Sequence, residues 1–225
     1  MRRLALLLAL APVLAPMLAP PSASAAGAKG TVADLVFDAD LMAMIEEPGT
    51  LDYAFRMEGR TFKEPYASAA RMEVREVAPD GEKQVWFDLF EGPNRRQFGP
   101  AEAKAQNPLI LVFLQRDVVQ MANLTGGSAA YFQHRIRAAF NGPAQVEPTT
   151  VEVDGAKVPA TRVTMRPFED DPKIDRFPAF KDKVYEFVVS DAVPGGLYRV
   201  ATEVPDPKTG ETILAESMTF KEIER

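Results

Sequence analysis

The sequence predicts an α+β domain in which a helical hairpin packs on the concave face of one curved, half-barrel-like antiparallel sheet. Residues 50–98 and 149–222 alternate apolar and polar side chains with the period of a β-strand. Between these two groups, residues 108–140 carry apolar side chains at helical spacing. Short connectors between successive strands favour antiparallel neighbours, so the two groups predict one sheet of about seven or eight strands.

Size and composition indicate a globular protein without a recognisable catalytic signature. The chain has 225 residues, of which 46% are hydrophobic and 26% charged, a balance typical of a packed core. The formal net charge is −6, which argues against nucleic acid as a partner because phosphate backbones favour basic surfaces. With no cysteine and a single histidine, thiol catalysis, disulfides and multi-histidine metal sites are excluded.

The N-terminal segment has the three parts of a secretory signal peptide. Arg2 and Arg3 give a positive start, residues 4–18 form a short apolar run, and Ala23-Ser24-Ala25 supplies small residues for cleavage. We therefore expect residues 1–25 to be removed, which leaves residues 26–225 as one domain. The apolar run is too short and proline-broken for a membrane span, and no second long apolar segment follows. The predicted location is the periplasm, with secretion to the medium as second choice.

The first strand group opens with a clear two-residue period. Leu51, Tyr53, Phe55 and Met57 fall on one face of a predicted strand. Pro79-Asp80-Gly81 predicts a turn, because proline presets φ and glycine accepts a positive φ. Residues 85–90 return from this turn with apolar side chains on both faces, which predicts a strand covered on both sides.

The middle of the chain changes to helical periodicity. Asn107-Pro108 is a typical helix start, and residues 109–114 form a continuous apolar run. Gly126-Gly127 predicts the end of this helix, and Ser128 is placed to cap a second one. The second helix presents one apolar stripe, made of Phe132, Ile136, Ala139 and Phe140.

The last third returns to strands joined by short turns. Asp154-Gly155 is the strongest short hairpin signal in the chain. Residues 168–183 have no regular period and predict a looser segment. No repeat or linker divides the chain. The predicted strands are 149–153, 157–166, 184–189, 197–204 and 212–221.

Neither the histidine nor the acidic cluster predicts a catalytic or metal site. His134 lies beside Arg135 and Arg137 without a nucleophile motif, so we interpret it as a surface residue of the second helix. Carboxylates gather at Glu169, Asp170, Asp171 and Asp175. Their spacing differs from a calcium-binding loop, and a solvated connector is the preferred interpretation. A hydrolase that uses two carboxylates ranks third among the possible functions, because no motif selects a pair.

Basic residues gather around the helices of this acidic chain. They could face an anionic head group or a membrane surface. They could equally pair with carboxylates on the sheet or cover apolar surface with their stems, and we prefer this because no run of four basic residues occurs. The residues concerned are Arg95, Arg96, Arg116, Arg135 and Arg137.

The order of the elements resembles the periplasmic lipoprotein-carrier superfamily, and also secreted bacterial families of that shape. The shared features are an early group of long strands within 51–90, helices within 108–140 and a meander to the C-terminus. The resemblance implies a half-open barrel closed by helices over an apolar cavity. It implies a carrier function by analogy alone.

These observations predict a non-enzymatic periplasmic carrier or binding protein for an apolar or amphipathic, lipid-like ligand, without a cofactor or metal. The ligand would lie between sheet and helices. The alternative is a structural or interaction module of the cell envelope, with a filled core and a docked protein partner. The residues predicted to line the ligand site are Tyr53, Phe55, Trp86, Phe113, Met121, Phe132 and Ile136.

Overall fold

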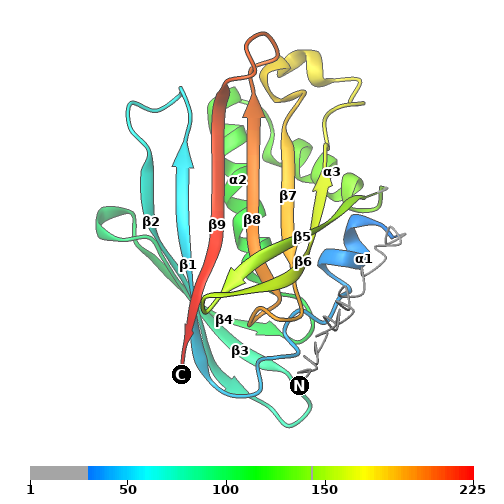
Figure 1. Cartoon of the computed structure of the whole chain (residues 1–225). Helices are drawn as coiled ribbons and strands as arrows, with labels where there is room; N and C mark the ends of the chain where they lie inside the picture. The colour runs from blue at the N-terminus through cyan, green and yellow to red at the C-terminus, as the bar shows by residue number, and fades with distance from the viewer. Residues whose placement is uncertain (1–29, 143) are drawn as a thin grey trace, which may run out of the picture.

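The computed structural model describes residues 30–142 and 144–225. Its centre is one antiparallel sheet of nine strands with helices on its concave face (Figure 1), so the predicted fold class is confirmed. The signal peptide predicted over residues 1–25 lies outside the described residues. In the described part of the chain, no helix is long and apolar enough to span a membrane. The strands are β1 (Gly49–Glu58), β2 (Tyr66–Val77), β3 (Lys83–Leu89), β4 (Arg96–Ala103), β5 (Gln145–Val153), β6 (Ala156–Met165), β7 (Val184–Val189), β8 (Leu197–Pro205) and β9 (Thr212–Glu224).

The sheet consists of two meanders joined at the centre. The strand order is β4-β3-β2-β1-β9-β8-β7-β6-β5, with every neighbouring pair antiparallel. The last strand, β9, therefore pairs with the first strand, β1. The helical hairpin of α2 (Leu109–Thr125) and α3 (Ala129–Phe140) connects β4 at one edge to β5 at the other. This connection carries the helices across the inner face.

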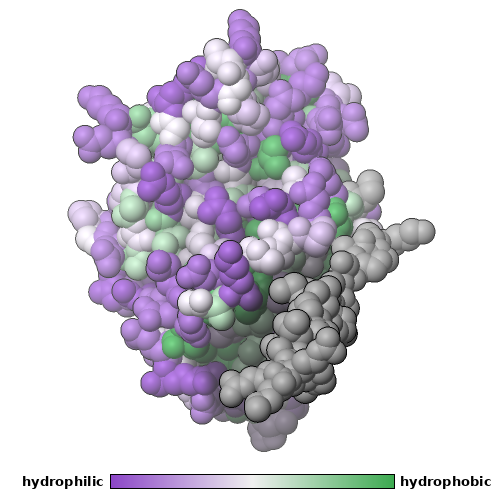
Figure 2. Space-filling view, viewed as in Figure 1, coloured by the Kyte–Doolittle hydropathy of each residue, from purple (hydrophilic) through white to green (hydrophobic). Residues whose placement is uncertain are grey.

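The core lies between the sheet and the helical hairpin. One row of inward side chains crosses the central strands, because the pairing places Phe55 opposite Met218, Met218 opposite Val200 and Val200 opposite Phe187. All four side chains are buried. The opposite face of the sheet is mostly hydrophilic, with apolar residues in small scattered groups (Figure 2). The alternation seen in the sequence therefore does separate a core face from a solvent face.

Two turns depend on glycine, and the first of them was predicted from the sequence. Asp154 and Gly155 both have positive φ, 51° and 76°, as the tight hairpin between β5 and β6 requires. At Gly196, between β7 and β8, φ is +67° and a β-carbon would lie 2.6 Å from Leu41 Cα. A side chain there would push away the segment that precedes β1.

Two elements were not predicted from the sequence. The edge strand β4 is the strand that the sequence did not predict. Almost all of its residues are exposed, and it contains Gly99-Pro100. It therefore lacks the alternation of apolar and polar residues by which a strand is recognised. The short helix α1 (Val32–Val36) precedes the sheet. The irregular segment 168–183 contains two single turns of 3-10 helix, Ile174–Arg176 and Pro178–Phe180.

Candidate functional site

The two helices of the hairpin leave a groove on the side away from the sheet. The α2 helix is apolar around most of its circumference, so it buries Phe113 and Met121 against the sheet and places the exposed Leu111 and the buried Val118 in the lining of the groove. The stripe on α3 contributes Ile136 and Phe140. Ile136 and Phe140 are themselves buried, and among the apolar residues that the two helices contribute to the lining, Leu111 is the exposed one.

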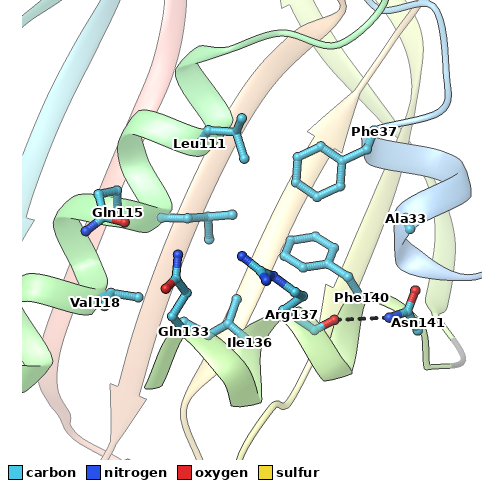
Figure 3. A pocket seen from close by; sticks show the side chains of 11 residues that line it. Ala33, Phe37, Leu111, Gln115, Val118, Gln133, Ile136, Arg137, Phe140 and Asn141 are labelled. Carbon is cyan, nitrogen blue, oxygen red and sulfur yellow. Dashed lines mark hydrogen bonds between the residues drawn. The ribbon is translucent and has the colours of Figure 1, made fainter. Parts of the chain in front are cut away.

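Helix α1 closes this groove on a third side (Figure 3). The Phe37 ring packs edge-on against Phe140 with 4.7 Å between the ring centres. A capping box fixes the start of α1: the Thr31 hydroxyl accepts a hydrogen bond from the Asp34 N–H, and the Asp34 carboxylate accepts one from the Thr31 N–H. These hydrogen bonds hold the pKa of Asp34 below its ordinary value.

We call this site the outer groove. Its volume is about 430 Å³, within the range of about 300–1,000 Å³ that is usual for small-molecule sites. Apolar walls with a few polar groups at the rim suit a ligand that is mainly apolar. The lining residues are Ala33, Phe37, Leu111, Leu114, Gln115, Val118, Gln133, Ile136, Arg137, Phe140 and Asn141.

A buried ionic cluster fixes α2 to the sheet beneath the groove. Asp117, on the inner face of α2, accepts hydrogen bonds from the Lys183 ammonium and, at 2.5 Å, from the Tyr185 hydroxyl. Both partners come from the far side of the core and are fully buried. Burial, with the neighbouring Asp117, raises the pKa of Tyr185 well above its ordinary value, so this hydroxyl stays protonated and donates.

A second ion pair lies one residue earlier on α2. Arg116 pairs with Glu216 of β9, and its guanidinium lies over the Phe55 ring, 4.7 Å from the ring centre. Glu216 is almost completely buried, and this burial raises the pKa of its carboxyl group. The two pairs place charged groups in the part of the interior where the sequence predicted an apolar ligand.

A third polar contact fixes the start of α2. The Asn107 side chain accepts a hydrogen bond from the Leu109 N–H and donates to the Gly195 carbonyl at 2.8 Å. It also donates to the Tyr53 hydroxyl, which in turn donates to the Leu197 carbonyl. The helix begins one residue later than predicted, with Pro108 at the N-cap, and the Asn107 side chain still binds the Leu109 N–H and ties the helix to the turn between β7 and β8.

Most of the residues predicted to line the ligand site lie in the packed core. Tyr53 packs against Phe220, and Phe132 against Phe168, with ring centres 5.7 and 6.0 Å apart. Of the predicted set, only Ile136 lines the outer groove. Contact of the others with a ligand stays a prediction. Those that are buried in the core are Tyr53, Phe55, Phe113, Met121 and Phe132.

The expected orientation of Trp86 is wrong. Val85, Phe87 and Leu89 point inward, so Trp86 lies on the opposite face of β3, where Arg75 covers its ring at 4.4 Å from the centre. Its ring is half-buried and turned away from the helices. The inner face of β3 is thus covered by protein, and on its other face the Arg75 guanidinium lies over the Trp86 ring.

The predicted pairing of the basic residues with carboxylates on the sheet is confirmed at two positions, where Arg95 pairs with Asp88 and Arg116 with Glu216. Arg135 pairs instead with Asp171, which lies in the irregular segment 168–183. Arg96 donates to backbone carbonyls instead. Arg137 has no ion-pair partner among the described residues, and it lines the outer groove.

The acidic segment is less solvated than predicted. Asp171 is buried, pairs with Arg135 and accepts a hydrogen bond from Tyr131. Burial, together with this carboxylate, raises the pKa of Tyr131 to about 12. His134 is exposed on α3, as predicted. In residues 30–142 and 144–225, no cluster of His, Asp and Glu side chains could hold a metal ion.

Comparison with known proteins gives distant structural likenesses. No protein-family model matches the chain, and no curated protein sequence matches it. The Mycobacterium tuberculosis lipoprotein LppX aligns over 78% of this chain and 86% of its own, with 11% identity and a TM-score of 0.32. A LolA superfamily protein from Nitrosomonas europaea aligns over 87% of this chain and 93% of its own, with 10% identity and a TM-score of 0.26.

Proposed function

We propose that this protein is a non-enzymatic binding protein that holds the apolar part of a lipid-like ligand in the outer groove. The observation that carries the proposal is the groove itself, a hollow of about 430 Å³ whose walls are mainly Leu, Val, Ile and Phe side chains. An apolar ligand that displaces water from such walls gains free energy. The polar residues of the lining are amides and one arginine, groups that orient a ligand by hydrogen bonds.

This location differs from the position between sheet and helices that was predicted from the sequence. Between α2 and the sheet, aromatic rings lie in contact, and Asp117, Lys183 and Glu216 are buried. An alkyl chain in that space would have to displace these contacts and leave charges without partners, which is costly. The outer groove requires neither change.

The location in the cell and the carrier role are part of the same proposal. The predicted signal peptide would export the protein to the periplasm, or to the medium as second choice. A groove open to solvent on one side could take up and release an apolar ligand without unfolding the core. The protein would thereby carry such a ligand through an aqueous compartment.

A matched pair of variants tests the groove. Leu111 and Leu124 are both exposed leucines of α2, at 46% and 51%, but only Leu111 lines the groove. Leu111→Gln should weaken the binding of Nile red, an uncharged apolar dye, by about tenfold, because roughly 1.4 kcal/mol of apolar contact is lost. Leu124→Gln should leave the affinity unchanged. Equal affinities in wild type and Leu111→Gln, or absence of dye binding, would contradict the proposal.

Lipids that copurify with the protein provide an independent test. Native mass spectrometry of the purified protein, followed by solvent extraction, should reveal a bound amphiphile that is depleted in Leu111→Gln and retained in Leu124→Gln. Recovery of the same amount from both variants would place the ligand elsewhere.

A second candidate function is docking of an envelope protein. Val119 and Leu124 are 44% and 51% exposed on α2 and lie outside the groove, so they could bury apolar area against a partner. A stoichiometric partner captured by wild type and lost in Leu124→Gln, without any bound lipid, would favour this function over ligand carriage.

A further inference from the structure

The charge of the outer groove indicates what kind of ligand it takes. The whole chain has 32 acidic and 26 basic residues, yet Arg137 is the only charged side chain among the described residues that line the groove. The neighbouring arginines are already neutralised, Arg116 by Glu216 and Arg135 by Asp171. The groove thus presents one cation without a carboxylate in a predominantly acidic protein.

Arg137 is placed to reach a ligand in the groove. It lies in the last turn of α3, and its guanidinium extends across the groove toward α2, alongside the Phe140 ring (Figure 3). The amide side chains of Gln115 and Gln133 lie on the two facing helices. Guanidinium and amide N–H groups beside apolar walls offer donors to an anion and contact area to an alkyl chain.

A purely structural role for Arg137 makes a different prediction. A cation in the last turn interacts favourably with the C-terminal end of a helix, and the arginine stem can cover apolar surface. Neither of these two effects requires a bound ligand. They would therefore change the stability of the protein and not its preference for the charge of a ligand.

We propose that the ligand is an anionic amphiphile, whose carboxylate or phosphate head group binds Arg137 while its alkyl chain lies against Leu111, Val118 and Ile136. The inference rests on the proposed function and deepens it. A charge-assisted hydrogen bond to Arg137 corresponds to an affinity gain of about tenfold.

Displacement of bound Nile red by three probes of equal chain length tests this inference. The probes are decanoate, decyl phosphate and decanol, used below their micelle concentrations. For wild type, both anions should bind about tenfold more tightly than the alcohol. Arg137→Gln should lose this preference and keep its affinity for decanol, and Arg137→Lys should retain part of the preference. Arg96→Gln, which changes an exposed arginine away from the groove, should behave as wild type.

The possible results separate the two proposals. If wild type binds Nile red and all three probes equally, or if Arg137→Gln keeps the preference, the anionic ligand is refuted and the apolar groove stands. If neither Nile red nor any probe binds, the proposed function itself fails. Inorganic phosphate at the same concentration should not displace the dye, and displacement as effective as that by decyl phosphate would refute an amphiphile as the ligand.

Discussion

At the scale of single residues, the least expected feature is the charge buried beneath α2. Asp117 and Lys183 are both almost fully buried and hydrogen-bonded to each other. A buried ion pair contributes little net stability, because desolvation offsets attraction, but removing one partner is expensive. The pair therefore fixes the position of α2 more than it strengthens the fold.

This account predicts a large cost for Lys183→Met. The variant leaves the Asp117 carboxylate buried with only the Tyr185 hydroxyl, so the free energy of unfolding should fall by about 3–5 kcal/mol in urea titrations. The double variant Asp117→Asn, Lys183→Met removes the orphaned charge and keeps an acceptor for Tyr185, so it should be more stable than the single variant. A loss below about 1 kcal/mol for Lys183→Met would show that the pair is not buried in solution.

Glu216 makes a prediction about pH. Burial raises the pKa of its carboxyl group above the ordinary 4.5, so the folded state keeps the proton to higher pH than the unfolded state. The contribution of Glu216 to stability is therefore complete below pH 4.5 and is lost as pH rises through the folded pKa. The measurement is the difference in free energy of unfolding between wild type and Glu216→Gln, obtained from urea titrations at several pH values. This difference should fall as pH rises from 4.5 through the folded-state pKa of Glu216. A difference that is constant or rises with pH would contradict this burial.

The inward direction of many residues was predictable, whereas their partners were not. The two-residue period correctly places Tyr53 and Phe55 on the core face. The same period, applied to Val85 and Phe87, assigns Trp86 to the other face of β3, but a strand that is apolar on both faces was expected to be covered on both. Nothing in the sequence indicates that Asp117 meets Lys183, because contacts between distant segments depend on the whole topology.

At the scale of elements, the strongly patterned segments were predictable and the weakly patterned ones were not. The boundaries of α2 and α3 follow from Asn107, Gly126 and Ser128, which mark a start, a stop and a restart. The edge strand β4 is exposed along almost its whole length, so it needs no alternation of apolar and polar side chains. The site was missed for a similar reason: its third wall, α1, is only five residues long and shows no helical period.

Helix α1 should matter for ligand binding. Phe37→Ala removes the ring that packs on Phe140 and opens one side of the groove. The affinity for Nile red should fall by a few-fold to about tenfold, since roughly 1 kcal/mol of apolar contact is lost. Phe98→Ala is the matched control, because Phe98 is 46% exposed on β4 and lies outside the groove. Equal losses in both variants would mean that α1 does not form a wall of the site.

At the scale of the whole molecule, the topology explains why the helices lie where they do. The central pairing of β1 with β9 joins the two meanders, so the chain between β4 and β5 has to return from one edge of the sheet to the other. It does so as α2 and α3, which cover the core with their inner sides. The space between α2 and α3, closed by α1, forms the hollow that we propose as the binding site.

Photo-crosslinking tests the position of this site most directly. A decanoate analogue with a diazirine at the end of its alkyl chain would be bound to the protein, photolysed and mapped by peptide mass spectrometry. We predict modification of Leu111, Leu114, Val118 or Ile136, with competition by unlabelled decanoate. Modification of inner-face residues such as Phe55 or Met121 would contradict the account, because it would place the ligand between the helices and the sheet.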